Sequence, residues 1–427
     1  MSLLGQPRRL LRRSAAPPLS RVGDYTFRFH APSLALEGVV QGAFSLNDII
    51  LKKTLHASDA TLTGYVTGQS MALLFPALWT DINRGRYVRS HYLWFGGAGR
   101  LLLIALAFVT APLPFAGIVV ASMILAYALI PSQNMLYQSN YRPGERGHAF
   151  GFARRIFAIG FVVAALAAGA LNQVHPYAWR GYYVVVALAG FLSFWLFWRV
   201  RLRRTRKGAA ADAPAAPPEA GDDWLWMRLG GSVRLLLGER DFLIYESFFF
   251  CYGLAFMMLS AVLPVFLVEG LHVDYAQAGT AKGLVMYGVF IIVSPLAGRL
   301  CDRWGPVRLA ATAFACMGLF PITLCFVHGI GALYGAYAIF GTSLAAVDIA
   351  WNLGPIHFAR GQDSTRFMGA HTSLVALRAL IGGPAGMTIL RMSGTPRATF
   401  VTAAVCLITG SAGMLWLSRR LARARSD

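Results

Sequence analysis

Apolar residues are gathered into long runs along this chain, and short polar segments separate the runs. A helix that crosses a bilayer needs about 20 predominantly apolar residues. Twelve runs meet that requirement, at residues 33–54, 61–80, 90–110, 114–136, 149–171, 177–198, 242–267, 275–299, 307–327, 330–356, 366–390 and 397–418. The pattern therefore predicts twelve transmembrane helices.

A closed β-barrel is the other architecture that satisfies every backbone polar group within lipid. Its strands alternate apolar and polar residues over about ten positions. The runs at 101–109 and 160–171 contain no such alternation. We therefore expect an all-α membrane protein.

The composition agrees with this prediction. The chain has 427 residues, of which 56% are hydrophobic and 14% are charged, and its mean hydropathy is +0.53. One or two soluble cores cannot bury so much apolar surface. The five cysteines include no CxxC pair and fall in or beside the spans, so we expect buried, reduced thiols.

The net charge of +20 would suggest a nucleic-acid partner in a soluble protein. Here the distribution of Lys and Arg along the chain indicates that the positive charge sets the membrane topology. Most of the 39 Lys and Arg residues lie in the two tails, the central segment and alternate loops, and few lie in the other loops. This asymmetry predicts a multi-pass protein of the cytoplasmic (inner) membrane with both termini in the cytoplasm, and no nucleic-acid partner.

The chain divides into two similar halves. Residues 1–30 lack the apolar core of a signal peptide and are predicted to be a basic cytoplasmic tail. Residues 31–198 and 241–418 are expected to form six-helix bundles, and residues 419–427 form a second tail. Between the bundles, 199–240 is predicted to be a cytoplasmic linker, with an Ala/Pro-rich stretch followed by an amphipathic helix at 224–240 on the inner membrane face.

Similar residues recur at one constant spacing in the two halves. The pairs are Asn134 with Asn352, Arg142 with Arg360, Glu145 with Asp363, and Gly151 with Gly369. They lie at the ends of the fourth and tenth spans and in the loops that follow. The repetition predicts duplicated halves, as in many secondary transporters.

A polar turn, GRLCDRWGPVR at 298–308, interrupts the apolar pattern between the eighth and ninth spans. It resembles the G-x-x-x-D-R-x-G-R-R signature of the major facilitator superfamily, with matches at Gly298, Asp302, Arg303, Gly305 and Arg308. The corresponding loop of the first half is degraded, and keeps Asp81, Gly85 and Arg86 with one extra residue before the glycine. The resemblance implies twelve transmembrane helices as two six-helix halves, with a substrate site near mid-membrane between them.

The turn has a physical interpretation of its own. An acidic residue at one helix end gains about 0.3–1 kcal/mol from the positive N-terminus of a neighbouring helix, and a glycine permits the reversal. We expect Asp302 to hold a helix end across a cytoplasmic gate. The alternative is a plain positively charged hairpin, which does not require the acidic residue.

Ionisable residues within spans are costly, so each is a candidate for binding or coupling. Asp48 is expected to face a central cavity or to pair with Arg100. Arg378 is expected to bind a carboxylate or phosphate of the substrate, or alternatively to pair with Asp348 or with carbonyls. The full set of candidates is Gln41, Asn47, Asp48, Arg100, Asp348, Asn352, His371 and Arg378.

Two acidic residues, Glu37 and Glu246, lie near the predicted cytoplasmic ends of their spans, where we expect them to face headgroup water. Lys282 is placed near the outer end of the eighth span. Asp48, Asp348 and His371 are the residues eligible to bind a coupling proton.

The resemblance and the buried charges together predict a secondary active transporter that moves a small organic solute by alternating access, coupled to protons. The alternative is an exporter of lipophilic drugs or lipid-like compounds. The sequence contains no GxSxG, Walker loop or His-rich cluster, so we expect no enzyme activity, cofactor or metal. The expected partners are the substrate, a coupling proton and the bilayer, and the expected state is a monomer.

Overall fold

The computed structural model describes residues 19–75, 88–202, 225–359 and 364–424, and the regular structure of these residues is helical throughout. The first half forms a bundle that we call the first bundle. Its elements are α2 (Arg21–Phe44), α3 (Asn47–Ile49), η1 (Ile50–Thr54), α4 (Asp59–Met71), η2 (Ala72–Leu74), η3 (Tyr92–Gly97), α6 (Ala98–Leu101), η4 (Leu102–Phe108), α7 (Pro112–Tyr127), α8 (Ile130–Asn140), α9 (Pro143–Val174) and α10 (Trp179–Arg199).

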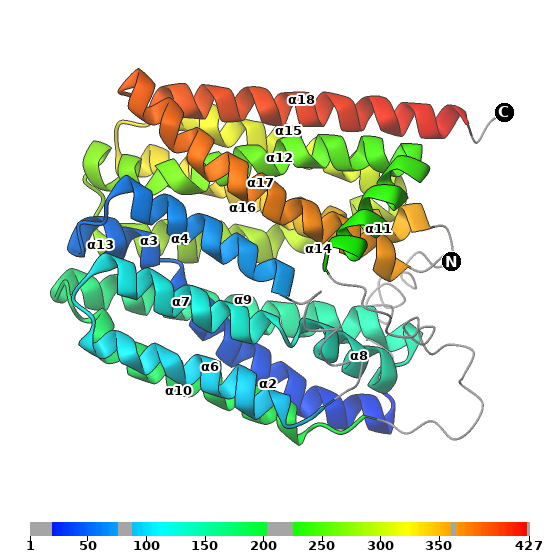
Figure 1. Ribbon diagram of the computed structural model, residues 1–427, viewed down its shortest axis with the longest axis horizontal. Coiled ribbons are helices and arrows are strands. Elements are labelled where there is room, and N and C mark those ends of the chain that lie inside the picture. Colours follow the sequence, from blue (N-terminus) through cyan, green and yellow to red (C-terminus); the bar gives the residue numbers. More distant parts are fainter. Residues whose placement is uncertain (1–18, 76–87, 203–224, 360–363, 425–427) are drawn as a thin grey trace, which may run out of the picture.

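The second half forms the second bundle, preceded by a separate helix, α11 (Leu225–Gly238), that packs against α12 and α17. The bundle itself contains α12 (Arg240–Val265), η6 (Phe266–Gly270), α13 (Tyr275–Gly279), η7 (Thr280–Tyr287), α14 (Gly288–Trp304), α15 (Pro306–Leu324), α16 (Ile330–Ala359), α17 (Ser364–Ser393) and α18 (Pro396–Arg423). Figure 1 shows that the start of α2 and the end of α18 lie at the same end of the molecule. We call this the terminal end and the opposite one the distal end.

The helices agree with the predicted spans. Among the described residues, ten helices are long and apolar enough to cross a membrane, and a shorter apolar helix covers Tyr92–Phe108. The remaining span, predicted at 61–80, begins as α4, and its last part lies outside the described residues. The predicted helix at 224–240 corresponds to α11.

The first helix begins well before its predicted start at residue 33. Ser20 caps α2 by accepting a hydrogen bond from the Gly23 amide, and Glu145 accepts hydrogen bonds from both the amide and the hydroxyl of Ser20 at 3.0 Å. These contacts satisfy helix-end donors that would otherwise lack partners. Residues 21–30, predicted to lie in the cytoplasmic tail, therefore belong to the helix.

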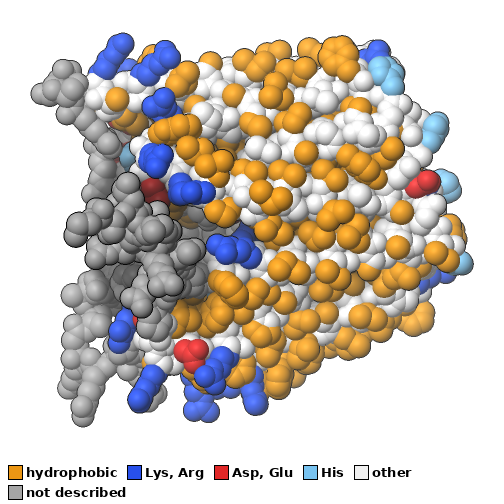
Figure 2. Space-filling model, turned by 180° about the vertical axis from the view of Figure 1, so that it is seen from behind, with side chains coloured by type: hydrophobic (Ala, Val, Ile, Leu, Met, Phe, Trp, Pro, Cys, Tyr) orange, Lys and Arg blue, Asp and Glu red, His pale blue; other side chains and the backbone are white. Residues whose placement is uncertain are grey.

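Figure 2 shows one face of the molecule with hydrophobic side chains spread over its middle. Lys and Arg side chains gather toward the terminal end of this face, and few lie at the distal end. Exposed apolar residues such as Val163, Ile292 and Val405 lie on helices that span the bundles. An apolar middle with basic residues at one end matches the surface of a protein that crosses a membrane.

Candidate functional site

The two bundles touch along α9 of the first and α13 and η7 of the second, and also along α4 and α17. Glycines permit the close approach of α9 and α13. A Cβ added at Gly169 would lie 2.7 Å from the carbonyl oxygen of Tyr275, and one added at Gly279 would lie 2.5 Å from the carbonyl oxygen of Ala165. Backbone therefore packs against backbone where the bundles meet near the distal end.

Charged side chains from both bundles meet at the distal end. Lys52 pairs with Glu269 at 2.7 Å and with Asp59 at 3.3 Å, Lys53 lies 3.7 Å from Asp274, and Arg391 lies 3.5 Å from Asp59. We call these six residues the distal network. The Lys53 ammonium also donates to the carbonyl oxygen of Val273 at 2.8 Å. The distal network and the glycine contact therefore join the two bundles at this end.

A partly buried ion pair joins the bundles deeper in the spans. The ammonium of Lys282, on η7, lies 2.7 and 2.6 Å from the two carboxylate oxygens of Asp48, on α3. The side chains of Lys282 and Asp48 are 11% and 18% exposed. Asp48 therefore pairs with a lysine of the other bundle and not with Arg100, one of the two predicted alternatives.

Arg100 lies inside the first bundle, where it pairs with Glu37 of α2. Its side chain is 1% exposed, and it also donates to Ser122 at 3.4 Å. Gln41 donates to the same Glu37 carboxylate at 3.0 Å. Glu37 does not lie at a helix end: since α2 begins at Arg21, it is about four turns into the helix.

A second ion pair joins the bundles nearer the terminal end. The guanidinium of Arg154, on α9, donates to the carboxylate of Asp348, on α16, at 3.1 Å. The side chain of Arg154 is 51% exposed and that of Asp348 is 32% exposed. The side-chain amide of Asn352 donates to the Asp348 carbonyl of its own helix at 2.7 Å. Arg154 and Asp348 are therefore accessible polar groups on facing helices.

His371 and Arg378 lie inside the second bundle. The Nδ1 atom of His371 is 2.9 Å from both carboxylate oxygens of Glu246, and both residues are fully buried. Arg378 is also buried, and it donates to the carbonyl oxygen of Phe249 at 3.4 Å. Glu246 therefore does not face headgroup water, and Arg378 forms a carbonyl contact instead of a pair with Asp348.

Asn47 is buried within the first bundle, where its side-chain carbonyl accepts a hydrogen bond from the Tyr183 hydroxyl. Asn47 directly precedes Asp48 in the chain, but its side chain contacts its own bundle and not the second one. Of the predicted candidates, Asp48 and Asp348 form ion pairs between the bundles.

The gate residues of the first half, Asp81, Gly85 and Arg86, lie outside the described residues. In the second half, Gly305 forms the turn from α14 to α15 with φ of +77°, a conformation that favours glycine. Gly298, Asp302 and Arg303 lie in α14, and Arg308 of α15 stacks over Trp304. Asp302 is exposed and forms no ion pair with any residue that the structure describes, so its contact across a gate stays a prediction.

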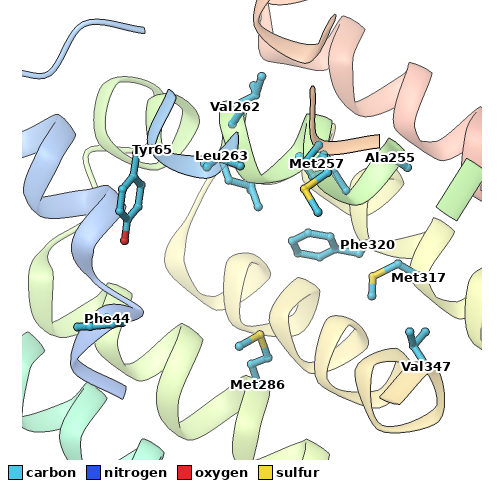
Figure 3. Packing of buried hydrophobic residues seen from close by; sticks show 14 of the residues in the cluster. Phe44, Tyr65, Ala255, Met257, Val262, Leu263, Met286, Met317, Phe320 and Val347 are labelled. Atoms are coloured by element: carbon cyan, nitrogen blue, oxygen red, sulfur yellow. The ribbon is translucent and has the colours of Figure 1, made fainter. Parts of the chain in front are cut away.

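Apolar side chains of both bundles belong to one buried cluster. Figure 3 shows part of it, with Phe44 and Tyr65 from the first bundle and Met257, Leu263 and Met286 from the second. A cavity of about 20 Å³ lies within the second bundle, with room for about one water molecule. It is lined by Phe256, Leu259, Ser260, Leu263, Met317, Phe320, Phe340 and Leu407.

Two helical bundles that meet around ion pairs within their spans are the arrangement found in secondary transporters. The family model of the Major Facilitator Superfamily matches residues 36–285 and 246–426. Together these matches cover most of the chain, which therefore belongs to the major facilitator superfamily. The predicted family and the fold of two six-helix halves are confirmed.

Solved structures of transporters resemble this fold. A variant of the nucleoside transporter NupG superposes with a TM-score of 0.69 at 13% identity, covering 92% of this chain and 99% of its own. A bacterial homologue of the human lysosomal transporter Spinster, in an inward-facing and unoccupied conformation, gives 0.66 at 15% identity, covering 94% and 98%. No curated protein matches the chain. Membership of this family makes the protein a multi-pass membrane transporter and not an enzyme.

Proposed function

We propose that this protein is a secondary active transporter that moves a small organic solute across the cytoplasmic membrane by alternating access, coupled to protons. The observation that carries the proposal is that ion pairs within the spans join opposite bundles, Asp48 with Lys282 and Arg154 with Asp348. Charges within a membrane are costly. Pairs placed between two rigid bodies would break and reform as the bundles rock.

The described contacts support a state that is closed at the distal end. The glycine contact and the distal network join the bundles there, whereas Arg154 is half-exposed nearer the terminal end. The basic residues of the terminal end favour a cytoplasmic orientation for it. The proposed state is therefore closed to the outside.

The candidate coupling residues differ in their surroundings. His371 pairs with Glu246 inside one bundle, so its environment changes little if the bundles move as rigid bodies. Asp48 and Asp348 pair across the bundles, so rocking would alter their electrostatic environment. We therefore assign proton coupling to Asp48 and Asp348. We assign contact with the solute to the accessible polar groups of Arg154, Asp348 and Asn352. One chain contains both bundles, so the proposed functional unit is a monomer.

Export of lipophilic or lipid-like compounds is the second candidate function. It is favoured by the apolar and methionine side chains that meet between the bundles, such as Phe44, Met257 and Met286 (Figure 3). Methionine side chains adapt to ligands of irregular shape. A lipophilic solute would contact this group, whereas an anionic solute would contact Arg154.

Uptake into proteoliposomes under an imposed pH gradient tests the proposal. The solutes to screen are organic anions, nucleosides and lipophilic cations, and the variants are Arg154→Gln and, as a matched control on the same helix, Arg155→Gln. We expect gradient-dependent flux of one class, which Arg154→Gln lowers at least tenfold and Arg155→Gln preserves.

Flux that ignores the pH gradient would contradict proton coupling. The absence of flux for every class would contradict the transport proposal. Lipophilic cations carried equally by both variants would favour the second candidate function over the first.

A further inference from the structure

One helix near the terminal end has an apolar side that is exposed among the described residues. Val233 and Leu237 of α11 lie one turn apart, and they are 54% and 72% exposed. On another side of the same helix, Leu235 and Leu236 pack into the hydrophobic cluster that the bundles share. A helix that is attached only to protein needs one apolar side. Helix α11 has two, and the second one faces away from the bundle.

The chain bends where α11 ends. Glu239 has φ of −109° and ψ of 82°, so the backbone leaves the helical conformation for one residue before α12 begins at Arg240. Figure 1 shows α11 near the terminal end, at an angle to the helices of the second bundle. A helix with an exposed apolar side, turned across the ends of spanning helices, is typical of one that lies in the membrane interface.

A tryptophan beside this bend marks the depth of the lipid headgroups. Trp416 of α18 is 51% exposed, and the guanidinium of Arg420 lies over its ring, 5.7 Å from the centroid. Arg420 also pairs at 3.1 Å with Asp241, in the first turn of α12. Exposed tryptophan and arginine side chains are enriched where a membrane meets water. The end of α11 therefore lies at the level of the headgroups.

The same corner of the molecule carries positive charge. Arg234 is exposed on α11, and Arg240 and Arg366 are exposed in the first turns of α12 and α17. These three residues form no ion pair with any residue that the structure describes. Of the acidic residues at the bend, Asp241 is already paired and Glu239 is half-buried. An apolar side with a basic border is complementary to anionic phospholipids.

Helix α17, on which α11 rests, belongs to the contact between the bundles. It packs against α11 at one place and against α4 of the first bundle at another. The hydroxyl of Thr67, on α4, donates to the Ala379 carbonyl of α17 at 3.4 Å. The rings of Phe242 and Phe367 join the first turns of α12 and α17, with centroids 4.9 Å apart. A restraint on α11 would therefore act on a helix that contacts the opposite bundle.

We propose that α11 is a docking site for anionic phospholipids of the leaflet at the terminal end, and that the bound lipids restrain the start of α17. The side chains of Val233 and Leu237 lie among the acyl chains, and Arg234 reaches the phosphate groups. Cationic side chains are attracted to an anionic membrane surface and not to a neutral one. This inference goes beyond the proposed function, because lipid binding at α11 requires neither a solute nor a proton.

Spin labels on α11 and α17 test the proposal. One preparation carries the label at Gly238→Cys and another at Gly369→Cys, and at both positions nothing lies within 4 Å of an added Cβ. The host is the full chain without its five native cysteines, in nanodiscs of phosphatidylcholine with increasing phosphatidylglycerol. The label on α11 reports immersion, as its collisions with oxygen relative to an aqueous nickel complex. The label on α17 reports mobility.

We expect the label on α11 to become immersed and the label on α17 to lose mobility over the same range of phosphatidylglycerol fraction. Arg234→Gln should move both midpoints to about fivefold more phosphatidylglycerol, the factor expected for one cation near an anionic surface. The matched control is Arg21→Gln, because Arg21 is exposed at the start of α2 in the other bundle. It should leave both midpoints unchanged. The double replacement Val233→Ser with Leu237→Ser should abolish immersion in every mixture.

Equal immersion in phosphatidylcholine alone would show an apolar anchor without preference for anionic lipid, and would overturn the proposal. Midpoints unmoved in Arg234→Gln would also overturn it, as would a label on α17 that ignores the lipid while the label on α11 responds. A response to inorganic phosphate in phosphatidylcholine discs would assign the site to the free anion instead. Dipolar broadening between two labelled chains would assign the exposed side to a second copy. These outcomes are separate from the proteoliposome flux, which tests the transport proposal.

Discussion

At the scale of single residues, buried charge in this protein is stabilised by specific partners. Arg100 has its guanidinium between the rings of Phe44 and Phe194, with Glu37 as its anion. A buried charge that loses its partner is strongly destabilising, by about 3–5 kcal/mol, whereas an apolar replacement of both partners is often neutral. This difference can be measured.

Replacing Glu37 with Gln should lower the stability of the folded protein by about 3 kcal/mol, because it leaves Arg100 buried without an anion. The double replacement Glu37→Leu with Arg100→Met should restore much of the loss. The measurement is the melting temperature in detergent, followed by tryptophan fluorescence.

The matched control is Asp24→Asn on the same helix. Asp24 pairs with Arg28 in an exposed contact, which should be worth under about 1 kcal/mol. Equal melting temperatures for Glu37→Gln and Asp24→Asn would show that the Arg100 pair is not a stabilising contact.

At the scale of elements, the close packing of α2 against α9 positions Glu37 and Gln41. A Cβ added at Gly38 would lie 2.1 Å from the carbonyl oxygen of Phe157, and one added at Gly42 would lie 2.3 Å from that of Phe161. The glycines thus allow helix backbones to touch, as small residues do in membrane helix pairs.

Alanine at Gly38 should therefore separate the helices and cost about 1–3 kcal/mol of stability. Alanine at Gly64 of α4 is the control, because nothing lies within 4 Å of an added Cβ there. It should be neutral or slightly stabilising, since alanine favours helix over glycine. Denaturation in SDS–detergent mixtures measures both, and equal effects would contradict the packing account.

At the scale of the whole molecule, the two ends differ in charge. We expect the terminal end to face the cytoplasm, in agreement with the basic residues that gather toward it in Figure 2.

In intact cells, His328→Cys at the distal end should react with a membrane-impermeant maleimide, and Ala424→Cys at the terminal end should react only after permeabilisation. Both positions are exposed, and the parent protein without added cysteine is the control. The reverse labelling pattern would invert the proposed topology.

The sequence predicted the fold well because bilayer spanning imposes a strong local pattern. Runs of apolar residues that are long enough to cross a membrane can be read directly from the sequence. The turn that contains Gly305 can be read from it as well. The depth of individual residues within the spans was predicted less well. The start of α2 depends on Glu145, a residue far along the chain, so Glu37 was placed too near a helix end.

The candidate site was predicted in part. Asp48 and Asp348 were singled out because an acid within a span is costly, and both proved to be paired between the bundles. Their partners, Lys282 and Arg154, were visible in the sequence as charges within spans, but nothing local indicates which charges meet. Arg378 and His371 fit the same sequence criterion yet lie sealed inside one bundle.

The sequence alone determined the class of this protein: its membrane setting, its two halves, its family and the residue types available for chemistry, because each follows from local composition and spacing. Only the tertiary structure decided which charges pair across the bundles and which stay within one. That choice depends on helix rotation and on the contact of distant segments, as in the interrupted first helix that offers Ser45 and Asp48 to Lys282.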